Sequence, residues 1–311
     1  MIDHRLTLVA EADLPEHLLP DVEHTLTHVG WIALTSARRR RVHPKGDLAI
    51  VDYRGHVPPL VPTHADHDHD AMFTELLSGL GDLGVTCLHV AGDLASMPPG
   101  LVVLDMDSTL INEEGLDELA ALAERQGYAP GAGAAIARTT ERAMAGELDF
   151  SASLRERVKA LRGIPLELFA RARPRLNVTT GAYDLVDAIH AAGGAVGVVS
   201  GGFHELIDPL LDELGVDFRA ANHFAVRDGR VTGVRGPIVD AAAKAECLRE
   251  WAREAGARRT AAIGDGANDL DMVRAASIGV GFCPKPALAI ECDAVVPFRR
   301  LDAVAELLGY L

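Results

Sequence analysis

The fold is decided by the stretch Leu101-Val102-Val103-Leu104-Asp105-Met106-Asp107-Ser108-Thr109. Four apolar residues followed by polar ones predict a short, buried parallel strand. Asp105 and Asp107 are two residues apart, so we expect their side chains to project to the same side beyond that strand. In open α/β sheets, ligands bind outside the carboxyl ends of the strands. The stretch therefore predicts a site for a cation or an electrophile, although a capped Asp/Ser turn has the same local pattern.

The apolar fraction of 48% and the charged fraction of 24% are typical of a soluble globular protein. A length of 311 residues suits two domains, or one large domain with a satellite. The net charge of −15 argues against nucleic acid as a partner. No apolar stretch approaches the roughly 20 residues that span a bilayer, and the N-terminus lacks the pattern of a signal peptide. We predict a cytoplasmic protein with no membrane partner and with four free thiols. These are Cys87, Cys247, Cys283 and Cys292.

Residues 1–95 are predicted to form a separate α+β domain. The order of its expected elements, βαββαβ, is that of a ferredoxin-like unit. In element order alone it resembles the ACT-like modules of amino-acid metabolism, although its first loop, 11–15, has no glycine and ligand binding is not expected. A linker is expected at 97–100. The expected strands are 6–10, 31–35, 48–53 and 85–90, and the expected helices are 18–29 and 71–83.

Two polar tracts in this region are predicted to be solvent-exposed segments rather than binding sites. Arg38–Arg41 is predicted to lie on a solvated edge strand, because alternating faces in an acidic protein leave little reason for an anion patch. His64–Asp70 alternates histidine and aspartate, but no strand or helix is expected to fix these side chains as metal ligands. We predict a polar loop there.

Residues 96–311 are predicted to form a doubly wound parallel α/β sheet. Apolar strands are expected at 195–200, 260–265 and 278–282, and helices at 203–214 and 241–254 lie between them. A stretch rich in Ala, Glu, Leu and Arg, about 117–178, follows the first strand. We expect it to form a helical cap over that strand's carboxyl end.

Three further strand ends and helices carry residues that fit the paired aspartates. Ser200-Gly201-Gly202 offers a hydroxyl and backbone N–H groups, which together can cradle a phosphate. Asp265, Asp105 and the backbone carbonyl of Asp107 would supply the oxygen ligands that Mg²⁺ prefers. Lys244 would neutralise negative charge nearby. Taken singly, each motif is also explained by a turn, a helix cap or a solvated lysine.

In chain order, these motifs resemble those of the haloacid dehalogenase superfamily over roughly residues 100–311. Within it, the run from Asp105 to Glu114 resembles the first motif of the phosphoserine phosphatase family. The segment Met144-x-Gly146-x-Leu148-x-Phe150-x-x-Ser153-Leu154-x-x-Arg157-Val158 is similar to that family's cap. The four superfamily motifs are Asp105-x-Asp107-x-Thr109, Ser200-Gly201-Gly202, Lys244 and Gly264-Asp265-Gly266-x-Asn268-Asp269.

The resemblance implies hydrolysis of O-phosphoserine to serine and phosphate through an aspartyl-phosphate, the last step of serine biosynthesis, with Mg²⁺ as cofactor. Asp105 would be the nucleophile, Asp107 the general acid and base, and Lys244 a further catalytic residue. The implied substrate-binding residues are Glu114 for the ammonium, Arg157 for the carboxylate, Phe150 as a shield, and Ser200, Gly201 and Asn268. The implied metal ligands are Asp105, Asp107 and Asp265, with Asp269 behind them.

Two alternative functions stay open at this stage. The same residues would suit a phosphotransferase that passes phosphate to another amino alcohol. The N-terminal region would suit an amino-acid-sensing regulatory protein, although a sensor has no need of Asp105 and Asp265. Homodimer formation is also left open. Cys283-Pro284-Lys285-Pro286, behind a strand but with no base nearby, is expected to be a structural loop rather than a nucleophile.

Overall fold

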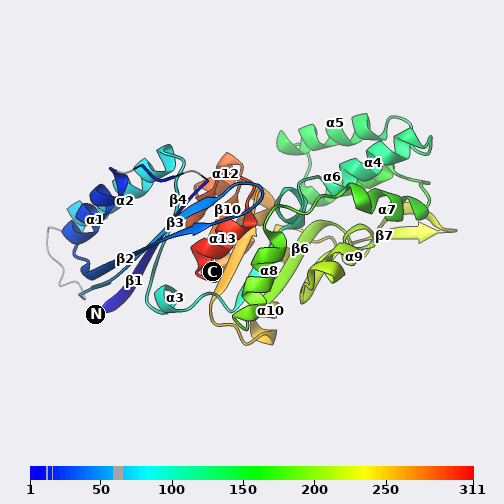
Figure 1. Cartoon of the computed structure of the whole chain (residues 1–311). Helices are drawn as coiled ribbons and strands as arrows, with labels where there is room; N and C mark the ends of the chain where they lie inside the picture. The colour runs from blue at the N-terminus through cyan, green and yellow to red at the C-terminus, as the bar shows by residue number, and fades with distance from the viewer. Residues whose placement is uncertain (12, 16, 59–65) are drawn as a thin grey trace.

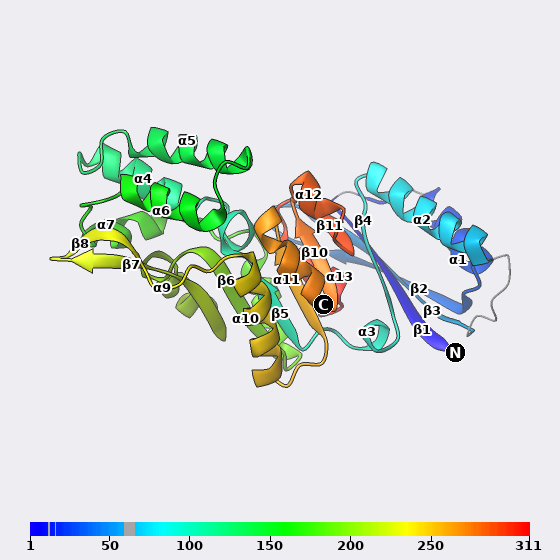
Figure 2. The ribbon, with the colours of Figure 1, turned by 180° about the vertical axis from the view of Figure 1, so that it is seen from behind.

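The computed structural model describes residues 1–11, 13–15, 17–58 and 66–311, which form two sheets (Figure 1). One sheet has four strands in the order β2-β3-β1-β4, and the other has seven in the order β11-β10-β9-β5-β6-β7-β8. Figures 1 and 2 show the four-stranded sheet at one end of the molecule and a group of helices at the other, with the seven-stranded sheet between them. Within the described residues, every helix is too short or too polar to cross a membrane.

The four-stranded sheet has the ferredoxin-like order that the sequence predicts. All its neighbouring strands are antiparallel. One face packs against α1 and α2 in a hydrophobic cluster of its own. The opposite face, with Val9, Leu48, Ile50 and Leu88, joins the main core of the chain. The elements are β1 (Ile2–Ala10), α1 (Leu18–His28), β2 (Ile32–Arg41), β3 (Leu48–Val57), α2 (Asp66–Asp82) and β4 (Thr86–Ala91), followed by α3 (Asp93–Ser96).

The prediction of a polar loop at 64–70 is wrong from Asp66 onward. Helix α2 begins at Asp66, five residues earlier than expected, and His64 and Ala65 lie outside the described residues. A run of alternating histidine and aspartate has no apolar periodicity from which a helix would be inferred. The start of α2 therefore had no local signal in this tract.

The predicted edge strand is confirmed and Arg38, Arg39 and Arg40 are exposed, but the prediction missed ion pairs of Arg39 and Arg41. β2 is an edge strand, but its side chains alternate, so Arg39 and Arg41 face helix α13 (Leu301–Leu308). Arg39 Nη1 lies 2.8 Å from Glu306 Oε2, and Arg41 Nε lies 3.3 Å from Asp302 Oδ2. Both acids are buried in α13. These pairs, at the edge of an apolar contact, tie the two sheets together.

β5 is the central strand that the opening stretch predicts. It pairs in parallel with β6 and β9, and the predicted parallel sheet is confirmed for the strands from β11 to β7. The antiparallel hairpin of β7 and β8 was not predicted. The strands are β5 (Leu101–Leu104), β6 (Ala195–Phe203), β7 (Phe218–Arg227), β8 (Arg230–Arg235), β9 (Thr260–Gly264), β10 (Ile278–Phe282) and β11 (Ala294–Val296).

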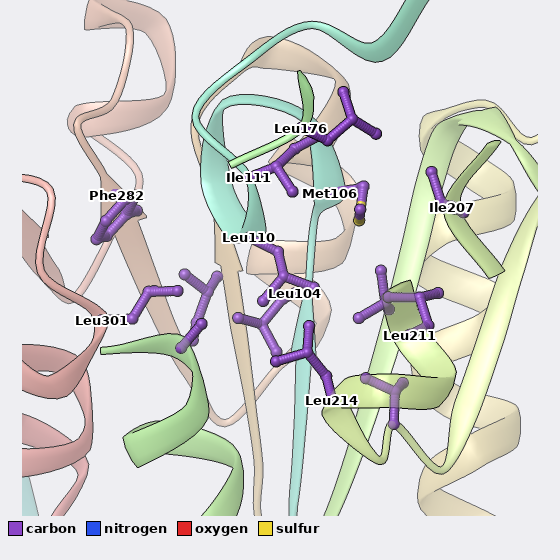
Figure 3. Close-up of a cluster of buried hydrophobic side chains, with 14 of the residues drawn as sticks. Leu104, Met106, Leu110, Ile111, Leu176, Ile207, Leu211, Leu214, Phe282 and Leu301 are labelled. Carbon is purple, nitrogen blue, oxygen red and sulfur yellow. The ribbon is translucent and has the colours of Figure 1, made fainter. Parts of the chain in front are cut away.

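Helices cover both faces of this sheet, which explains why β5 is apolar throughout. Val102 and Leu104 face α8, α9 and α13, whereas Leu101 and Val103 face α10 and α11. Figure 3 shows Leu104 between Leu211 of α9 and Leu301 of α13. The covering helices are α8 (Ala182–Ala191), α9 (His204–Leu214), α10 (Ala241–Glu254), α11 (Leu270–Ala275) and α13, and a short α12 (Pro286–Ala289) follows β10.

Between β5 and α8 the chain forms the inserted helices that the sequence predicts. They stand apart from the four-stranded sheet and above β7 and β8 in Figures 1 and 2. Backbone hydrogen bonds join them to the β7–β8 hairpin, from Gly163 N to Val231 O (2.8 Å) and from Leu166 N to Gly229 O (3.0 Å). They are α4 (Gly115–Arg125), α5 (Ala132–Met144), α6 (Phe150–Ala160) and α7 (Glu167–Ala172).

A tight turn before α8 connects α13 with the loop that follows β5. Thr179 Oγ1 donates to Thr109 O (2.7 Å), and Leu301 N donates to Thr180 O (2.8 Å). Gly181 has φ +82°, and a Cβ there would overlap the backbone and side chain of Asp302. The start of α13 therefore packs directly on the backbone of this turn.

We expect Gly181→Ala to destabilise the fold more than a matched change at Gly193. Gly193 has a similar φ of +75°, but a Cβ added there would have nothing within 4 Å, so Gly193→Ala should cost only the backbone strain, about 1–2 kcal/mol. Gly181→Ala adds overpacking against Asp302, about 1–3 kcal/mol more. Urea unfolding of both variants measures the difference. Equal losses would show that the turn and α13 are not in rigid contact.

Candidate active site

The carboxyl ends of β5, β6 and β9 open into a cavity of about 170 Å³. Because these three strands are parallel neighbours, residues far apart in the chain meet at one edge of the sheet. The inserted helices contribute the other side of the cavity. Its lining residues are Asp105, Asp107, Glu114, Leu116, Phe150, Leu154, Arg157, Gly201, Gly202, Phe203, Asp265, Asn268 and Lys285.

A single irregular turn positions the second aspartate and Glu114. Residues Met106–Leu110 turn sharply at Ser108, which has φ +57°. The turn lets Asp107 Oδ1 accept a hydrogen bond from Gly115 N (2.7 Å) and lets Ser108 Oγ donate to Glu114 Oε1 (3.0 Å). Ser108 thus holds Glu114 at the cavity, a role that the sequence did not indicate.

Lys244 is buried between two carboxylates. Helix α10 is capped by Asp240, the residue before its start, whose side chain accepts from Ala243 N, and Lys244 follows one turn later. Its Nζ lies 2.5 Å from Asp105 Oδ1 and 2.7 Å from Asp269 Oδ1, and only 1% of its side chain is exposed. Although burial disfavours the ammonium, Asp105 and Asp269 raise the pKa of Lys244 above its ordinary value. Lys244 therefore stays charged and fixes the position of Asp105.

Three buried carboxylates can hold a divalent cation. Asp105, Asp265 and Asp269 each offer an oxygen within 4.8 Å of the other two, and hard oxygen donors of this kind suit Mg²⁺. Both oxygens of Asp269 already accept hydrogen bonds, Oδ1 from Lys244 and Oδ2 from the backbone N–H groups of Asp265 and Gly266. Asp105 and Asp265 are therefore better placed to contact a cation directly, with Asp269 behind them. The carboxylate of Asp107 lies outside this cluster.

Burial shifts the proton affinity of the paired aspartates. Burial, together with the charge of Glu114, raises the pKa of Asp107 to about 7. Burial and Asp269 also raise the pKa of Asp105, while Lys244 acts against that change. A carboxyl group with a pKa near neutrality can both give and take a proton at physiological pH.

The inserted helices contact the glycine-rich end of β6 through Phe150. A Cβ on Gly201 would lie 2.7 Å from Cζ of Phe150, so only glycine fits beneath this ring. Ser200 is fully buried and its Oγ accepts from Gly202 N (2.8 Å), behind the cavity wall. The strand continues through these residues to Phe203, so the expected helix begins one residue later than predicted, at His204.

Arg157 and Glu114 place opposite charges in the cavity. Arg157, on α6, has a buried Nε with no hydrogen-bond partner in the described part of the chain. Asn268 also lines the cavity, from the short helical turn Ala267–Asp269. The predicted site residues are thus gathered at this one edge, with Ser200, Lys244 and Asp269 beneath the surface.

Sequence reasoning missed two residues besides Ser108. Lys285, assigned to a structural loop, lies with its Nζ 3.0 Å from Asp265 Oδ2. Asn222, on β7, donates from Nδ2 to Gly201 O (2.9 Å) and so holds the glycine-rich segment in place. For Lys285 the available signal was its position just after the carboxyl end of a predicted strand. Asn222 had no such signal.

The chain matches the model of the haloacid dehalogenase-like hydrolase family over residues 102–274 and belongs to that family. It is 45% identical over 212 residues to the phosphoserine phosphatase of Streptococcus thermophilus, covering 67% of this chain and 95% of that one. A probable phosphoserine phosphatase from Vibrio cholerae matches 98% of this chain and 86% of its own, with 29% identity and a TM-score of 0.69. A solved phospho-aspartyl intermediate analogue of phosphoserine phosphatase matches 67% of this chain and 98% of its own, with 36% identity and a TM-score of 0.61.

We expect Lys244→Met to lower the free energy of unfolding by about 3–5 kcal/mol, because it leaves two buried carboxylates without their cation. Adding Asp269→Asn should restore part of this stability by removing one of the two charges. Urea unfolding measures both effects, and Lys159→Met, at an exposed lysine of α6, is the matched control. Wild-type stability in Lys244→Met would show that the carboxylates do not depend on the ammonium.

Proposed function

We propose that this hydrolase converts O-phosphoserine to serine and phosphate through an aspartyl-phosphate on Asp105, with Mg²⁺ as cofactor, in the last step of serine biosynthesis. The observation that carries the proposal is the pair Glu114 and Arg157, which face the same cavity as Asp105 and Asp107. One carboxylate and one guanidinium beside a nucleophile suit the ammonium and the carboxylate of an amino acid. The names of the relatives point to the same substrate.

In the first step, a carboxylate oxygen of Asp105 attacks phosphorus in line. The bond from phosphorus to the serine oxygen breaks, and Asp107 gives that oxygen its proton. Lys244, bound to Asp105 Oδ1, leaves the second oxygen, Oδ2, as the attacking atom. In the second step Asp107 takes a proton from water as the water oxygen attacks phosphorus, which releases phosphate and frees Asp105.

The surrounding residues bind and shield the phosphoryl group. When bound at Asp105, Asp265 and the backbone carbonyl of Asp107, with Asp269 behind, Mg²⁺ would neutralise charge on the phosphoryl oxygens. The N–H of Gly201 and the amide of Asn268 would hold these oxygens, and the buried hydroxyl of Ser200 would support them from behind through Gly202 N. Phe150, over Gly201, would exclude bulk water from the first step.

At the other end of the substrate, Arg157 would bind the carboxylate and Glu114 the ammonium. The buried Nε of Arg157, which has no hydrogen-bond partner among the described residues, supports this assignment, because a buried N–H without a partner is unfavourable until an anion binds. Ser108 supports the other half, since it fixes the carboxylate of Glu114 by a hydrogen bond. Together they would select an amino acid over a simple alcohol phosphate.

The proposal includes the division of the chain into two domains. Residues 1–95 would be an ACT-like domain, and 96–311 the phosphatase core with its cap at about 117–178. The separate hydrophobic cluster under α1 and α2 supports this boundary. A cytoplasmic location is also part of the proposal, since the four cysteines are free.

We expect the purified protein to hydrolyse phosphoserine faster than phosphothreonine or p-nitrophenyl phosphate, and to lose activity on chelation of Mg²⁺. Asp105→Asn should reduce turnover at least about 10⁴-fold and abolish trapping of the phosphoenzyme, because an amide is not a nucleophile. Asp271→Asn, at an exposed aspartate of α11, is the matched control. A phosphoenzyme in Asp105→Asn would contradict the assignment, and phosphate appearing on an added amino alcohol would indicate transfer rather than hydrolysis.

Arg157→Ala separates recognition of the amino acid from the chemistry. We expect kcat/KM for phosphoserine to fall about 100-fold, the effect of losing a charge-assisted contact, while p-nitrophenyl phosphate, which has no carboxylate, loses less than about threefold. Arg155→Ala, at an exposed arginine on the same helix, should change neither substrate. Steady-state kinetics with both substrates give the ratio. Equal losses would show that Arg157 supports the cap rather than the substrate.

A further inference from the structure

Lys285 is a cavity residue to which neither the sequence motifs nor the mechanism above assigns a role. After β10 the chain turns at Cys283, which has φ +45°. Lys285 then stands between Pro284 and Pro286 in the sequence, and these prolines stiffen the backbone on both sides of it. Lys285 N donates to Asp265 O (2.8 Å), so the lysine is anchored to the loop after β9. Its side chain then lies over Gly266 and lines the cavity.

The ammonium of Lys285 is held less tightly than that of Lys244. Its one ion pair within the described residues is with Asp265 Oδ2 at 3.0 Å, and 60% of its side chain is exposed, compared with 1% for Lys244. Burial acts against its charge, but Asp265, Glu114 and Asp105 raise the pKa of Lys285 above its ordinary value. Lys285 is therefore a charged group that is free to change partner, whereas Lys244 is not.

Lys285 supplies part of the positive charge that balances the carboxylates of the cavity. Among the residues that the structure describes, five carboxylates lie in or directly beneath the cavity, and three cations lie beside them: Lys244, Arg157 and Lys285. A bound divalent cation makes the total neutral when all five carboxylates are ionised. Phosphoserine with a dianionic phosphate has a net charge of −2, so the positive charge of Lys285 favours its binding. The carboxylates are Asp105, Asp107, Glu114, Asp265 and Asp269.

The three cations are also divided in space. Lys244 is engaged by Asp105 and Asp269 below the cavity, and Arg157 approaches from the cap. Lys285 lines the cavity beside Asp265, one of the carboxylates that would hold a divalent cation. Because Lys285 is long, flexible and charged, it can contact a phosphoryl oxygen there by leaving Asp265.

We propose that Lys285 binds the phosphoryl group of the substrate and the phosphate product, alongside the metal. A bound phosphoryl oxygen replaces Asp265 Oδ2 as its partner, and Asp265 is then free for the metal. The proposal rests on the proposed function only in that the substrate has a phosphoryl group. It therefore applies to any phosphate monoester that this hydrolase accepts.

Calorimetric titration of the Mg²⁺-loaded protein with inorganic phosphate tests this role. We expect Lys285→Met to weaken phosphate binding about 10- to 100-fold, the usual effect of losing a charge-assisted hydrogen bond, and Lys285→Arg to recover most of it. The KM for phosphoserine and for p-nitrophenyl phosphate should rise by similar factors, unlike the selective loss in Arg157→Ala. Lys159→Met, at an exposed lysine outside the cavity, is the matched control.

Titration with Mg²⁺ alone separates this role from a structural one. If Lys285 binds phosphate, Lys285→Met should bind Mg²⁺ at least as tightly as the wild type, because a positive charge near the metal has been removed. Weaker Mg²⁺ binding, or unchanged phosphate binding, would overturn the proposal and leave Lys285 as a support for Asp265. Should the wild type cleave p-nitrophenyl phosphate but not phosphoserine, the proposed function fails, while the phosphate titrations still decide the role of Lys285.

Discussion

The buried ammonium of Lys244 between Asp105 and Asp269 is the interaction on which the site depends. An isolated charge in this position would be strongly unfavourable, so the three groups stabilise one another only when helix α10 and the strands β5 and β9 are all in place. Asp269 in turn accepts the backbone N–H groups of Asp265 and Gly266 and shapes the loop after β9. One ion network thus couples the packing of the sheet to the geometry of the cavity.

Around this network the charged groups differ in burial and in the number of their partners, and the difference matches their proposed roles. The groups that must stay fixed are buried and have several partners, as Lys244 and Asp269 do. The groups that would meet a substrate have few partners in the described part of the chain, where the Nε of Arg157 has none and Lys285 has a single ion pair. A cavity built in this way is rigid beneath the reacting atoms and adaptable where a ligand enters.

The four-stranded sheet is attached to the rest of the chain by an apolar contact with ion pairs at its edge. Its centre is apolar and continuous with the main core, while Arg39 and Arg41 pair with buried acids of α13. The turn at Gly181 links the same helix to the loop behind Asp107 through Thr179 and Thr180. The N-terminal sheet is therefore in continuous contact with the segment that carries the paired aspartates.

By itself, the sequence determined the central strand, the parallel order around it, the inserted helices and the ferredoxin-like N-terminal order, because each depends on local periodicity and on turn residues. It also indicated the residues at the strand ends, since parallel strands must bring their carboxyl ends to one edge. Only the tertiary structure decided that Ser108 holds Glu114, that Asn222 supports Gly201, and that Lys285 reaches the cavity. These contacts join segments far apart in the chain or depend on one unusual φ, and neither leaves a periodic signal in the sequence.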